Sequence, residues 1–197
     1  MSVDSLTVML WGQVIGTVQR GRGGRLTFTY DAAWRTSSRA SPLSLSMPLA
    51  AAEHGHDRID AFLWNLLPDN QRVLDAWGRR FHVSPRNAFS LIAEVGEDCA
   101  GAVQLVRPER VDALLDPGPP MIAWLDEAGV AERLAALRRD HSAWLPPRDT
   151  GQFSLAGAQP KIALPFDEGR WGVPQGRTPT THVLKPPTGE FAGSVEH

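Results

Sequence analysis

Residues 5–30 read SLTVMLWGQVIGTVQRGRGGRLTFTY, and this stretch decides the fold of the first half of the chain. Apolar residues alternate with other residues from position 6 to position 10, which is the two-residue period of a strand. A tight turn at Gly12-Gln13 and a longer turn over residues 20–25 separate three such runs. We therefore expect an antiparallel meander of three strands. Residues 41–49 alternate as well, but their prolines restrict them to an edge strand or an extended loop.

The region that follows has the pattern of helices. Apolar residues recur every three and four positions over residues 58–81, and Pro68 interrupts the run. Asp69 or a neighbour is expected to cap a second helix. The Ser-Pro pair at residues 84–85 is expected to open a third helix, which Gly96 ends. Strands followed by a run of helices indicate an α+β fold.

Further signals follow in the second half of the chain. Residues 101–106 read as a short strand, and the proline-rich residues 108–120 read as a linker. Residues 124–141 read as a helix. Four candidate strands come next, at residues 153–156, 161–164, 170–173 and 181–185. The expected fold class is therefore α+β, with an antiparallel sheet and helices followed by a second, β-rich region.

The composition is that of a folded protein without a strong overall charge. The chain has 197 residues, of which 42% are hydrophobic and 21% charged, and its formal net charge is −2. These values fit one large or two small globular domains and do not indicate a broad basic surface. Because Cys99 is the single cysteine, a disulfide framework and a cysteine-based zinc site are excluded. The sequence has no long apolar run and no signal-peptide pattern, so we expect a cytoplasmic protein.

The most informative motif is SLAGAQPKIAL at residues 154–164. Its small residues, Ala156 to Ala158, allow the backbone to approach a ligand closely, and successive N–H groups there can face an anion. Lys161 adds a positive charge, so a phosphate could bind at this motif. A tight hairpin needs the same residues, and the spacing alone favours the hairpin. The motif is not a Walker A loop, because it lacks the Gly-Lys-Ser/Thr ending.

A second candidate is Thr181-His-Val-Leu-Lys185, an apolar strand that ends in a lysine. In protein kinases a strand lysine of this kind contacts the α- and β-phosphates of ATP. Lys185 lies 28 positions after Gly157, which leaves room for two intervening strands. Taken alone, a lysine at the end of a strand is usually a solvated surface group.

Three other features rank lower as functional sites. His54 and His56 could share a metal ion, but no third ligand is near in sequence, so a solvated loop is favoured and no metal is expected. Cys99 follows two acidic residues, which disfavours a reactive thiolate. The glycine-rich turn at residues 21–24 is not followed by a helix, as a dinucleotide-binding fingerprint requires.

Together these motifs resemble the HipA serine/threonine kinases, the toxin half of the HipBA toxin–antitoxin modules. The resemblance rests on residues 154–161, followed by residues 176–179 and by the lysine-ended strand at 181–185. Trp64-Asn-Leu-Leu-Pro-Asp-Asn70 and Gly101-Ala-Val103 also resemble the N-terminal subdomain of that family. The resemblance therefore extends from the first strand to the last residue.

The resemblance implies a division of the chain into three parts. Residues 1–107 would be the HipA N-terminal subdomain that docks the partner, residues 108–120 a linker, and residues 121–197 the start of a protein-kinase-like N-lobe. The implied partner is a HipB-like helix-turn-helix antitoxin, so DNA would be reached only through the antitoxin. The implied protein substrate is an aminoacyl-tRNA synthetase, and no membrane is involved.

The resemblance also assigns roles to particular residues, with ATP and Mg²⁺ as the implied cofactors. The residues implied to bind ATP are Ala156, Gly157, Ala158, Gln159, Pro160, Lys161 and Lys185. Ser154 would be the autophosphorylation position. A phosphate there brings a charge of about −1.5 to −2 and competes with ATP for the same donors.

The chemistry that this resemblance implies is incomplete in the chain. Phosphoryl transfer needs an acid to hold Mg²⁺ and a group to position the attacking hydroxyl, and no HRD-like or DFG-like segment appears. We therefore expect no catalytic residue in this chain, an absent C-terminal lobe and no activity in isolation. The alternative is a non-catalytic module that docks the antitoxin or a separate kinase lobe. A third interpretation is a plain α+β ligand-binding protein in which the AGAQPK turn is only a hairpin.

Overall fold

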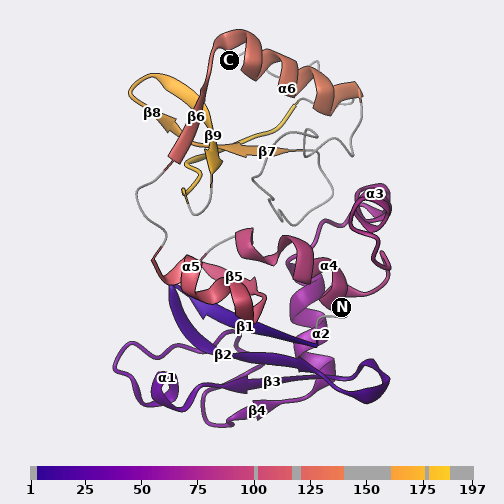
Figure 1. Ribbon diagram of the computed structural model, residues 1–197, viewed down its shortest axis with the longest axis vertical. Helices are drawn as coiled ribbons and strands as arrows, with labels where there is room; N and C mark the ends of the chain where they lie inside the picture. The colour runs from indigo at the N-terminus through magenta and orange to yellow at the C-terminus, as the bar shows by residue number, and fades with distance from the viewer. Residues whose placement is uncertain (1–3, 100–101, 117–120, 140–160, 176–177, 187–197) are drawn as a thin grey trace. The chain divides into compact units, whose positions relative to one another are not determined.

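The computed structural model describes residues 4–99, 102–116, 121–139, 161–175 and 178–186 (Figure 1). The chain forms two compact units, and the described residues up to 116 belong to the first and those from 121 onward to the second. Each unit combines antiparallel strands with helices. The α+β class is therefore confirmed.

A five-stranded antiparallel sheet organises the first unit. Its strands are β1 (Ser5–Leu10), β2 (Gln13–Arg20), β3 (Leu26–Tyr30), β4 (Glu53–His54) and β5 (Val103–Val106). Their order in the sheet is β4-β3-β2-β1-β5, so the expected three-strand meander is confirmed. β5 comes from much later in the chain and pairs with β1 at one edge.

The first hairpin turns at Trp11-Gly12, one residue earlier than the sequence indicated. Leu10 pairs with Gln13, and φ is 50° at Trp11 and 74° at Gly12. Two residues of positive φ give a turn whose twist matches that of the flanking strands. The left-handed conformation costs a non-glycine residue roughly 1 kcal/mol, and Trp11 adopts it with its side chain 66% exposed.

Four helices lie between β3 and β5 in the sequence: α1 (Ala32–Thr36), α2 (His56–Asn65), α3 (Gln71–Phe81) and α4 (Ala88–Val95). The break expected at Pro68 separates α2 from α3. Asn70, a neighbour of Asp69, caps α3 by accepting a hydrogen bond from a first-turn N–H at 3.0 Å. α2 packs against β3 and α4, and its Ile59 and Leu63 are fully buried.

α4 begins later than the Ser-Pro pair before it predicted. Its N-cap is Asn87, whose side-chain oxygen accepts a hydrogen bond from the Ser90 N–H at 2.9 Å. Ser84 closes a turn instead, in which its carbonyl accepts a hydrogen bond from the Asn87 N–H at 3.2 Å. A Cβ on Gly78 of α3 would lie 3.0 Å from Pro85, so the ring of Pro85 packs on α3. This contact holds the pair in the turn and delays the helix.

Gly96 ends α4 because of a close approach and not because of a left-handed backbone. Its φ is −72°, and a Cβ on this residue would lie 2.5 Å from the carbonyl oxygen of Leu105 in β5. The short 3-10 turn η2 (Gly96–Asp98) follows directly. The glycine therefore lets the end of α4 lie against the edge strand of the sheet.

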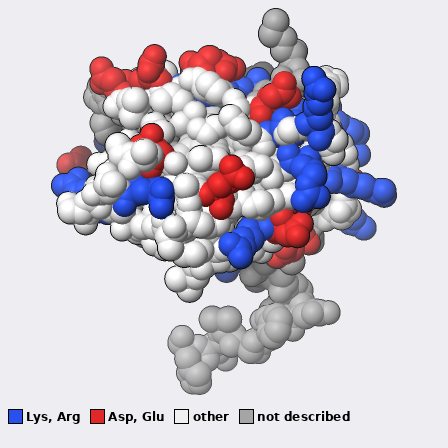
Figure 2. All heavy atoms as spheres, turned by 90° about the horizontal axis from the view of Figure 1, so that it is seen from below, with Lys and Arg blue, Asp and Glu red and all other residues white. Residues whose placement is uncertain are grey.

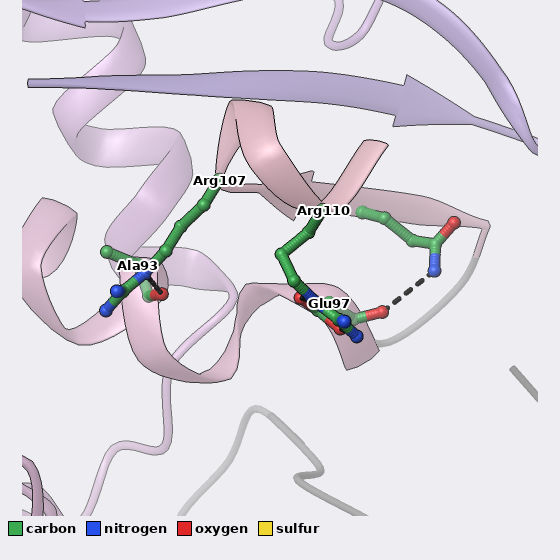
Figure 3. Close-up of polar contacts among 5 residues, drawn as sticks. Ala93, Glu97, Arg107 and Arg110 are labelled. Carbon is green, nitrogen blue, oxygen red and sulfur yellow. Dashed lines mark hydrogen bonds and ion pairs between the residues drawn. The ribbon is translucent and has the colours of Figure 1, made fainter. Parts of the chain in front are cut away.

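Two arginines that follow β5 fasten the end of α4 (Figure 3). Arg107 donates from Nε to the Ala93 carbonyl at 3.1 Å, and its guanidinium forms an ion pair with Glu94. Arg110 donates to both oxygens of the Glu97 carboxylate, at 2.9 and 3.2 Å, and this hydrogen-bonded charge raises the pKa of Arg110. Side-chain contacts thus reinforce the junction between α4, η2 and β5.

Residues 108–115, the first part of the segment expected to be a linker, are helical. They form η3 (Pro108–Arg110) and α5 (Val111–Leu115). Leu114 is buried and packs with Met9 of β1 and Val106 of β5. Pro108 opens the turn, where a missing N–H costs nothing. The proline that indicated a linker therefore starts a helix that belongs to the core of the first unit.

The loop between α1 and β4 is held to the sheet by two aromatic side chains. The Tyr30 hydroxyl donates to the Met47 carbonyl at 2.6 Å and accepts from the Leu43 N–H at 2.7 Å. His54 is 2% exposed, stacks on Phe28, and donates from Nε2 to the Pro48 carbonyl at 3.2 Å. The alternating, proline-containing segment is therefore an extended loop and not an edge strand.

The second unit contains two small antiparallel sheets in its described residues. β6 (Met121–Leu125), β9 (Arg170–Gln175) and β8 (Phe166–Asp167) form one sheet in that order, and β7 (Ile162–Leu164) pairs with β10 (His182–Leu184) in the other. The strands expected near residues 161–164, 170–173 and 181–185 are confirmed, and the one expected at 153–156 lies outside the described residues. In the described parts of the chain, no helix is long and apolar enough to cross a membrane.

A strand occupies the position where the sequence predicted the start of a helix at Trp124. β6 pairs with β9 along its whole length, with Trp124 opposite Gly172. A Cβ on Gly172 would lie 2.2 Å from the Ile122 side chain, so the glycine makes room for β6. Asp126 then caps α6 (Glu127–Arg139) by accepting a hydrogen bond from the Gly129 N–H at 2.7 Å. The helix therefore begins after the strand.

Replacing Tyr30 by phenylalanine tests how firmly this side chain holds the loop. The substitution leaves the Met47 carbonyl and the Leu43 N–H without their partner. The free energy of unfolding should fall by about 1–3 kcal/mol, as measured by urea denaturation at neutral pH. A change within about 0.5 kcal/mol, as is usual for surface substitutions, would contradict this role.

The same residue predicts a dependence of stability on alkaline pH. Burial raises the pKa of Tyr30 above 10.0, although the hydrogen bond from Leu43 opposes the shift. Folding therefore favours the neutral phenol, and the resulting stability is complete below pH 10.0 and is lost as the pH rises through the raised pKa. The wild-type chain should lose this increment in alkaline denaturation series, whereas Tyr30→Phe should not. Parallel curves for the two proteins would be inconsistent with the prediction.

Candidate functional site

The two lysines of the chain, Lys161 and Lys185, flank the same end of one antiparallel strand pair. β7 pairs with β10 through Leu164↔His182, Ala163↔Val183 and Ile162↔Leu184. Lys161 directly precedes β7 and Lys185 directly follows β10, so the next register position sets one lysine against the other. Two motifs 24 positions apart in the sequence therefore meet at one end of this sheet.

The two lysines differ in their exposure to solvent. Lys161 is 7% exposed, whereas Lys185 is exposed. Ammonium groups are rarely buried, because leaving water is costly for a charge. Lys161 is therefore built into the interior of the second unit, and Lys185 presents its charge to solvent, where a ligand can reach it.

Two threonines fix the segment that leads into β10. Thr178 Oγ1 accepts from the Met121 N–H at 2.9 Å and donates to the Met121 carbonyl at 2.8 Å. Thr181 Oγ1 accepts from the Phe166 N–H at 2.8 Å. Sequence reasoning missed both contacts. The signal was the run Thr178-Pro-Thr-Thr181, since threonine hydroxyls often replace backbone partners in irregular segments.

Aromatic rings pack against β10, the strand that precedes Lys185. The ring centroids of Phe166 and Trp171 lie 4.6 Å apart, and the His182 ring of β10 lies 5.2 Å from Trp171. On the neighbouring strands, the Arg170 guanidinium lies 4.4 Å from the Trp124 ring centroid. The contacts of His182 with Trp171 and Phe166 link β10 to the three-stranded sheet.

Most of the predicted phosphate loop lies outside the described residues. This applies to Ser154, Ala156, Gly157, Ala158, Gln159 and Pro160. Lys161 and Lys185 are described and lie at one end of the same strand pair. The approach of the loop to Lys185 stays a prediction.

The lower-ranked candidates serve the fold of the first unit. His54 is buried, and both of its ring nitrogens have polar neighbours. His56 Nδ1 accepts a hydrogen bond from the Leu26 N–H at 3.2 Å. The expectation of a solvated loop is therefore wrong, because these rings replace backbone partners beside β3. Cys99 is buried, and within the described ranges no three metal-ligating side chains gather.

Comparison with known families gives this fold a name. Residues 6–106 match the family model described as the HipA N-terminal domain, from within β1 to the end of β5. This match covers half of the chain. The chain belongs to the HipA N-terminal domain family. The resemblance inferred from the motifs is thereby confirmed.

Two curated relatives extend the HipA similarity beyond this domain. The chain is 35% identical over 199 residues to the "Putative kinase Y4mE" of Sinorhizobium fredii, with 100% of this chain and 46% of the relative aligned. It is 31% identical over 162 residues to the serine/threonine-protein kinase toxin HipA of Shewanella oneidensis, covering 79% of this chain and 34% of the relative. The chain thus spans less than half the length of these relatives.

A solved structure supports the same assignment at the level of the fold. The HipA chain in a structure of Shewanella oneidensis HipA, HipB and operator DNA matches with a TM-score of 0.65 and 27% identity. The match covers 90% of this chain and 39% of that chain. Both units of the described structure therefore share their folds with a HipA protein.

The different burial of the two lysines predicts different effects on stability. Lys161→Ala removes a buried side chain and should lower the free energy of unfolding by more than about 1 kcal/mol. Lys185→Ala removes an exposed one and should change it by less than about 0.5 kcal/mol. Thermal or urea denaturation of the two variants measures both values. A destabilised Lys185→Ala would mean that its side chain serves the fold.

Proposed function

We propose that this chain is the N-terminal part of a HipA-type serine/threonine kinase toxin, and that its second unit covers the phosphates of ATP. The observation that carries the proposal is the position of Lys161 and Lys185 at one end of the β7–β10 pair. Lys161 also closes the AGAQPK motif, whose small residues allow a ligand to approach the backbone.

The electrostatics of the lysine pair favour an anionic ligand. Two like charges at neighbouring register positions repel each other when no ligand is bound. A phosphate bound at exposed Lys185 offsets this repulsion with attraction, worth about 1 kcal/mol per charge pair in water and more where water is excluded. We assign the contact with the α- and β-phosphates to exposed Lys185. Buried Lys161, the last residue of the AGAQPK motif, then fixes the start of β7.

The remaining catalytic parts are assigned to the portion of the longer relatives that this chain does not span. In kinases, acids hold Mg²⁺ against the phosphates and a further group positions the attacking hydroxyl. Without these groups, this chain binds ATP weakly and transfers no phosphate by itself. We also propose that phosphorylation of Ser154, close to the phosphate loop in sequence, opposes ATP binding by charge repulsion.

The first unit is proposed to dock a helix-turn-helix antitoxin. The solved Shewanella structure is described as HipA with HipB and its operator DNA. In this chain Leu45 is 94% exposed on the loop that Tyr30 and His54 hold in place. Trp11 is 66% exposed in a left-handed turn. Apolar side chains on rigid supports are typical anchors of protein interfaces, because little entropy is lost when they bind.

The cell biology of the proposal follows from the family resemblance alone. The protein would act in the cytoplasm, and its substrate would be an aminoacyl-tRNA synthetase whose phosphorylation stalls translation. A docking module without catalysis is the second candidate, and the exposed Leu45 and Trp11 favour it. Loss of Lys185 distinguishes the two, because a docking module does not need this charge.

The kinase proposal predicts how Lys185 affects ATP. In the protein purified from its native cell, Lys185→Ala should abolish phosphoryl transfer from labelled ATP, while the exposed control Arg139→Ala should keep this activity.

The 197-residue chain alone should bind ATP weakly. Calorimetry should give a Kd of about 1 mM or weaker, equivalent to about −4 kcal/mol or less favourable. Undiminished transfer in Lys185→Ala, or micromolar binding to the chain alone, would show that the site is misplaced.

The docking proposal predicts a role for Leu45 that is independent of ATP. Leu45→Asp should weaken the complex with the antitoxin by about tenfold or more, because a charge replaces an apolar anchor. Stability should be unchanged, since the side chain is 94% exposed. Ala51→Asp adds the same charge at an exposed position of the same loop and is the matched control. Equal affinities of the two variants, measured by surface plasmon resonance, would argue against docking through Leu45.

A further inference from the structure

We propose that the first unit binds the phosphate backbone of duplex DNA directly, through a cluster of arginines that we call the basic end. Its members are Arg20, Arg22, Arg25, Arg79, Arg80 and Arg86. The family resemblance implied contact with DNA only through an antitoxin, and the net charge of −2 for the whole chain gave no indication of a broad basic surface. The fold, however, gathers positive charge from two distant segments.

The β2–β3 hairpin contributes the first group of arginines. Arg20 ends β2, and Arg22 and Arg25 are exposed in the turn that follows. The turn is closed by a hydrogen bond from the Gly21 N–H to the Arg25 carbonyl at 2.8 Å. The hairpin therefore presents its arginines on a defined support.

The end of α3 and the turn after it contribute the second group. Arg79 and Arg80 occupy the last turn of α3, and Arg86 lies directly before the N-cap of α4. All three are exposed. The packing of Gly78 on Pro85 folds the turn back onto α3, which brings Arg86 close to the helix end that carries Arg79 and Arg80.

Contacts of Arg20 join the two groups. Its Nη1 donates to Ser90 Oγ at 3.3 Å, and its guanidinium lies 4.9 Å from the Phe89 ring centroid. Both residues belong to the first turn of α4, which Arg86 precedes by a single N-cap residue. The hairpin and the α3–α4 turn are thus neighbours, although about 60 residues separate them in the sequence.

The basic end carries little compensating negative charge. Arg20 pairs with Asp4 at 3.4 Å, and no described acid forms an ion pair with the other five arginines. The nearest acid on α3 is Asp75, which is hydrogen-bonded to Gln71. Figure 2 shows Lys and Arg side chains gathered along one side of the face that it draws, with acidic side chains next to some of them.

The side chains of the basic end fit a nucleic acid better than a protein. Protein interfaces have an apolar centre, whereas surfaces that bind DNA are polar and positively charged. The large, exposed apolar residues described in the first unit are Trp11, Leu45 and Leu115, and none lies on the hairpin turn or on residues 79–86. Guanidinium groups also form bidentate hydrogen bonds with phosphate oxygens, which ammonium groups cannot do.

The choice of DNA over RNA rests on the proposed function. A related HipA was solved with HipB and operator DNA, so an antitoxin bound to this chain would bring a duplex with it. A direct backbone contact would then add affinity without reading sequence. The arginines and the antitoxin would act on the same DNA molecule.

The test compares two variants of the 197-residue chain that lose the same charge. One is Arg79→Gln/Arg80→Gln/Arg86→Gln, and the control is Arg39→Gln/Arg138→Gln/Arg139→Gln, at exposed positions elsewhere. Binding of a fluorescent DNA duplex is measured by anisotropy over a series of salt concentrations. The basic-end variant should bind about tenfold more weakly at low salt, and its log–log salt slope should fall by about 0.9 for each lost phosphate contact. The control should keep the wild-type slope.

Several results would overturn the proposal. They are equal binding by the two variants, an unchanged salt slope in the basic-end variant, and preferential competition by an RNA duplex. Loss of antitoxin binding with full retention of DNA binding would assign the surface to a protein partner and would overturn it as well. If the triple variant unfolds, the three single substitutions replace it, each lowering the slope by about 0.9. Phosphoryl transfer is not part of this measurement, so its outcome is separate from that of the kinase proposal.

Discussion

The pairing of β5 with β1 is the constraint on which the first unit depends. It joins Val103–Val106 to residues near the start of the chain, so helices α1 to α4 form within the segment that it closes. This pairing requires the backbone at the end of α4 to lie directly against the backbone of β5. Gly96 permits it, since any side chain there would meet the Leu105 carbonyl. Arg107 and Arg110 then stabilise the junction. Leu114, which follows β5 in the sequence, packs against Met9 and Val106 of the sheet.

The second unit follows a comparable principle on a smaller scale. Pairing between β6 and β9 joins residues about 50 positions apart, and Gly172 makes room for it. β7 and β10 then bring the two lysines of the chain to the same end of a strand pair. In both units a strand from late in the sequence completes a sheet that an early strand begins. The two lysines therefore meet because distant segments pair in the second unit.

The charge distribution shows why overall composition was a poor guide to binding surfaces. A net charge of −2 conceals a local excess, because many acids lie on elements other than those of the basic end. Several acids are also engaged with particular arginines, as Glu94 is with Arg107 and Glu97 with Arg110. Electrostatic attraction acts over about one Debye length, roughly 8–10 Å, so the local arrangement matters more than the sum.

Local patterns in the sequence were sufficient for the elements whose own residues decide their form. The meander from β1 to β3 and the break at Pro68 follow from periodicity and from the backbone chemistry of proline. The end of α4 at Gly96 was predicted as well, although its cause is the contact with β5. The motif match also pointed to the correct family. Of the candidate site, the sequence supplied the residue types and their order, including both lysines.

Tertiary structure decided the features that depend on a distant partner. Trp124 is in a strand because β9 pairs with it. Leu114 of the helical residues 108–115 packs on Met9 of β1 and Val106 of β5, and α4 starts late because Pro85 packs on α3. The burial of His54 and Lys161, the exposure of Lys185 and the meeting of two arginine groups have the same origin. Periodicity reports which face of a segment is apolar, but only the folded chain determines what covers that face.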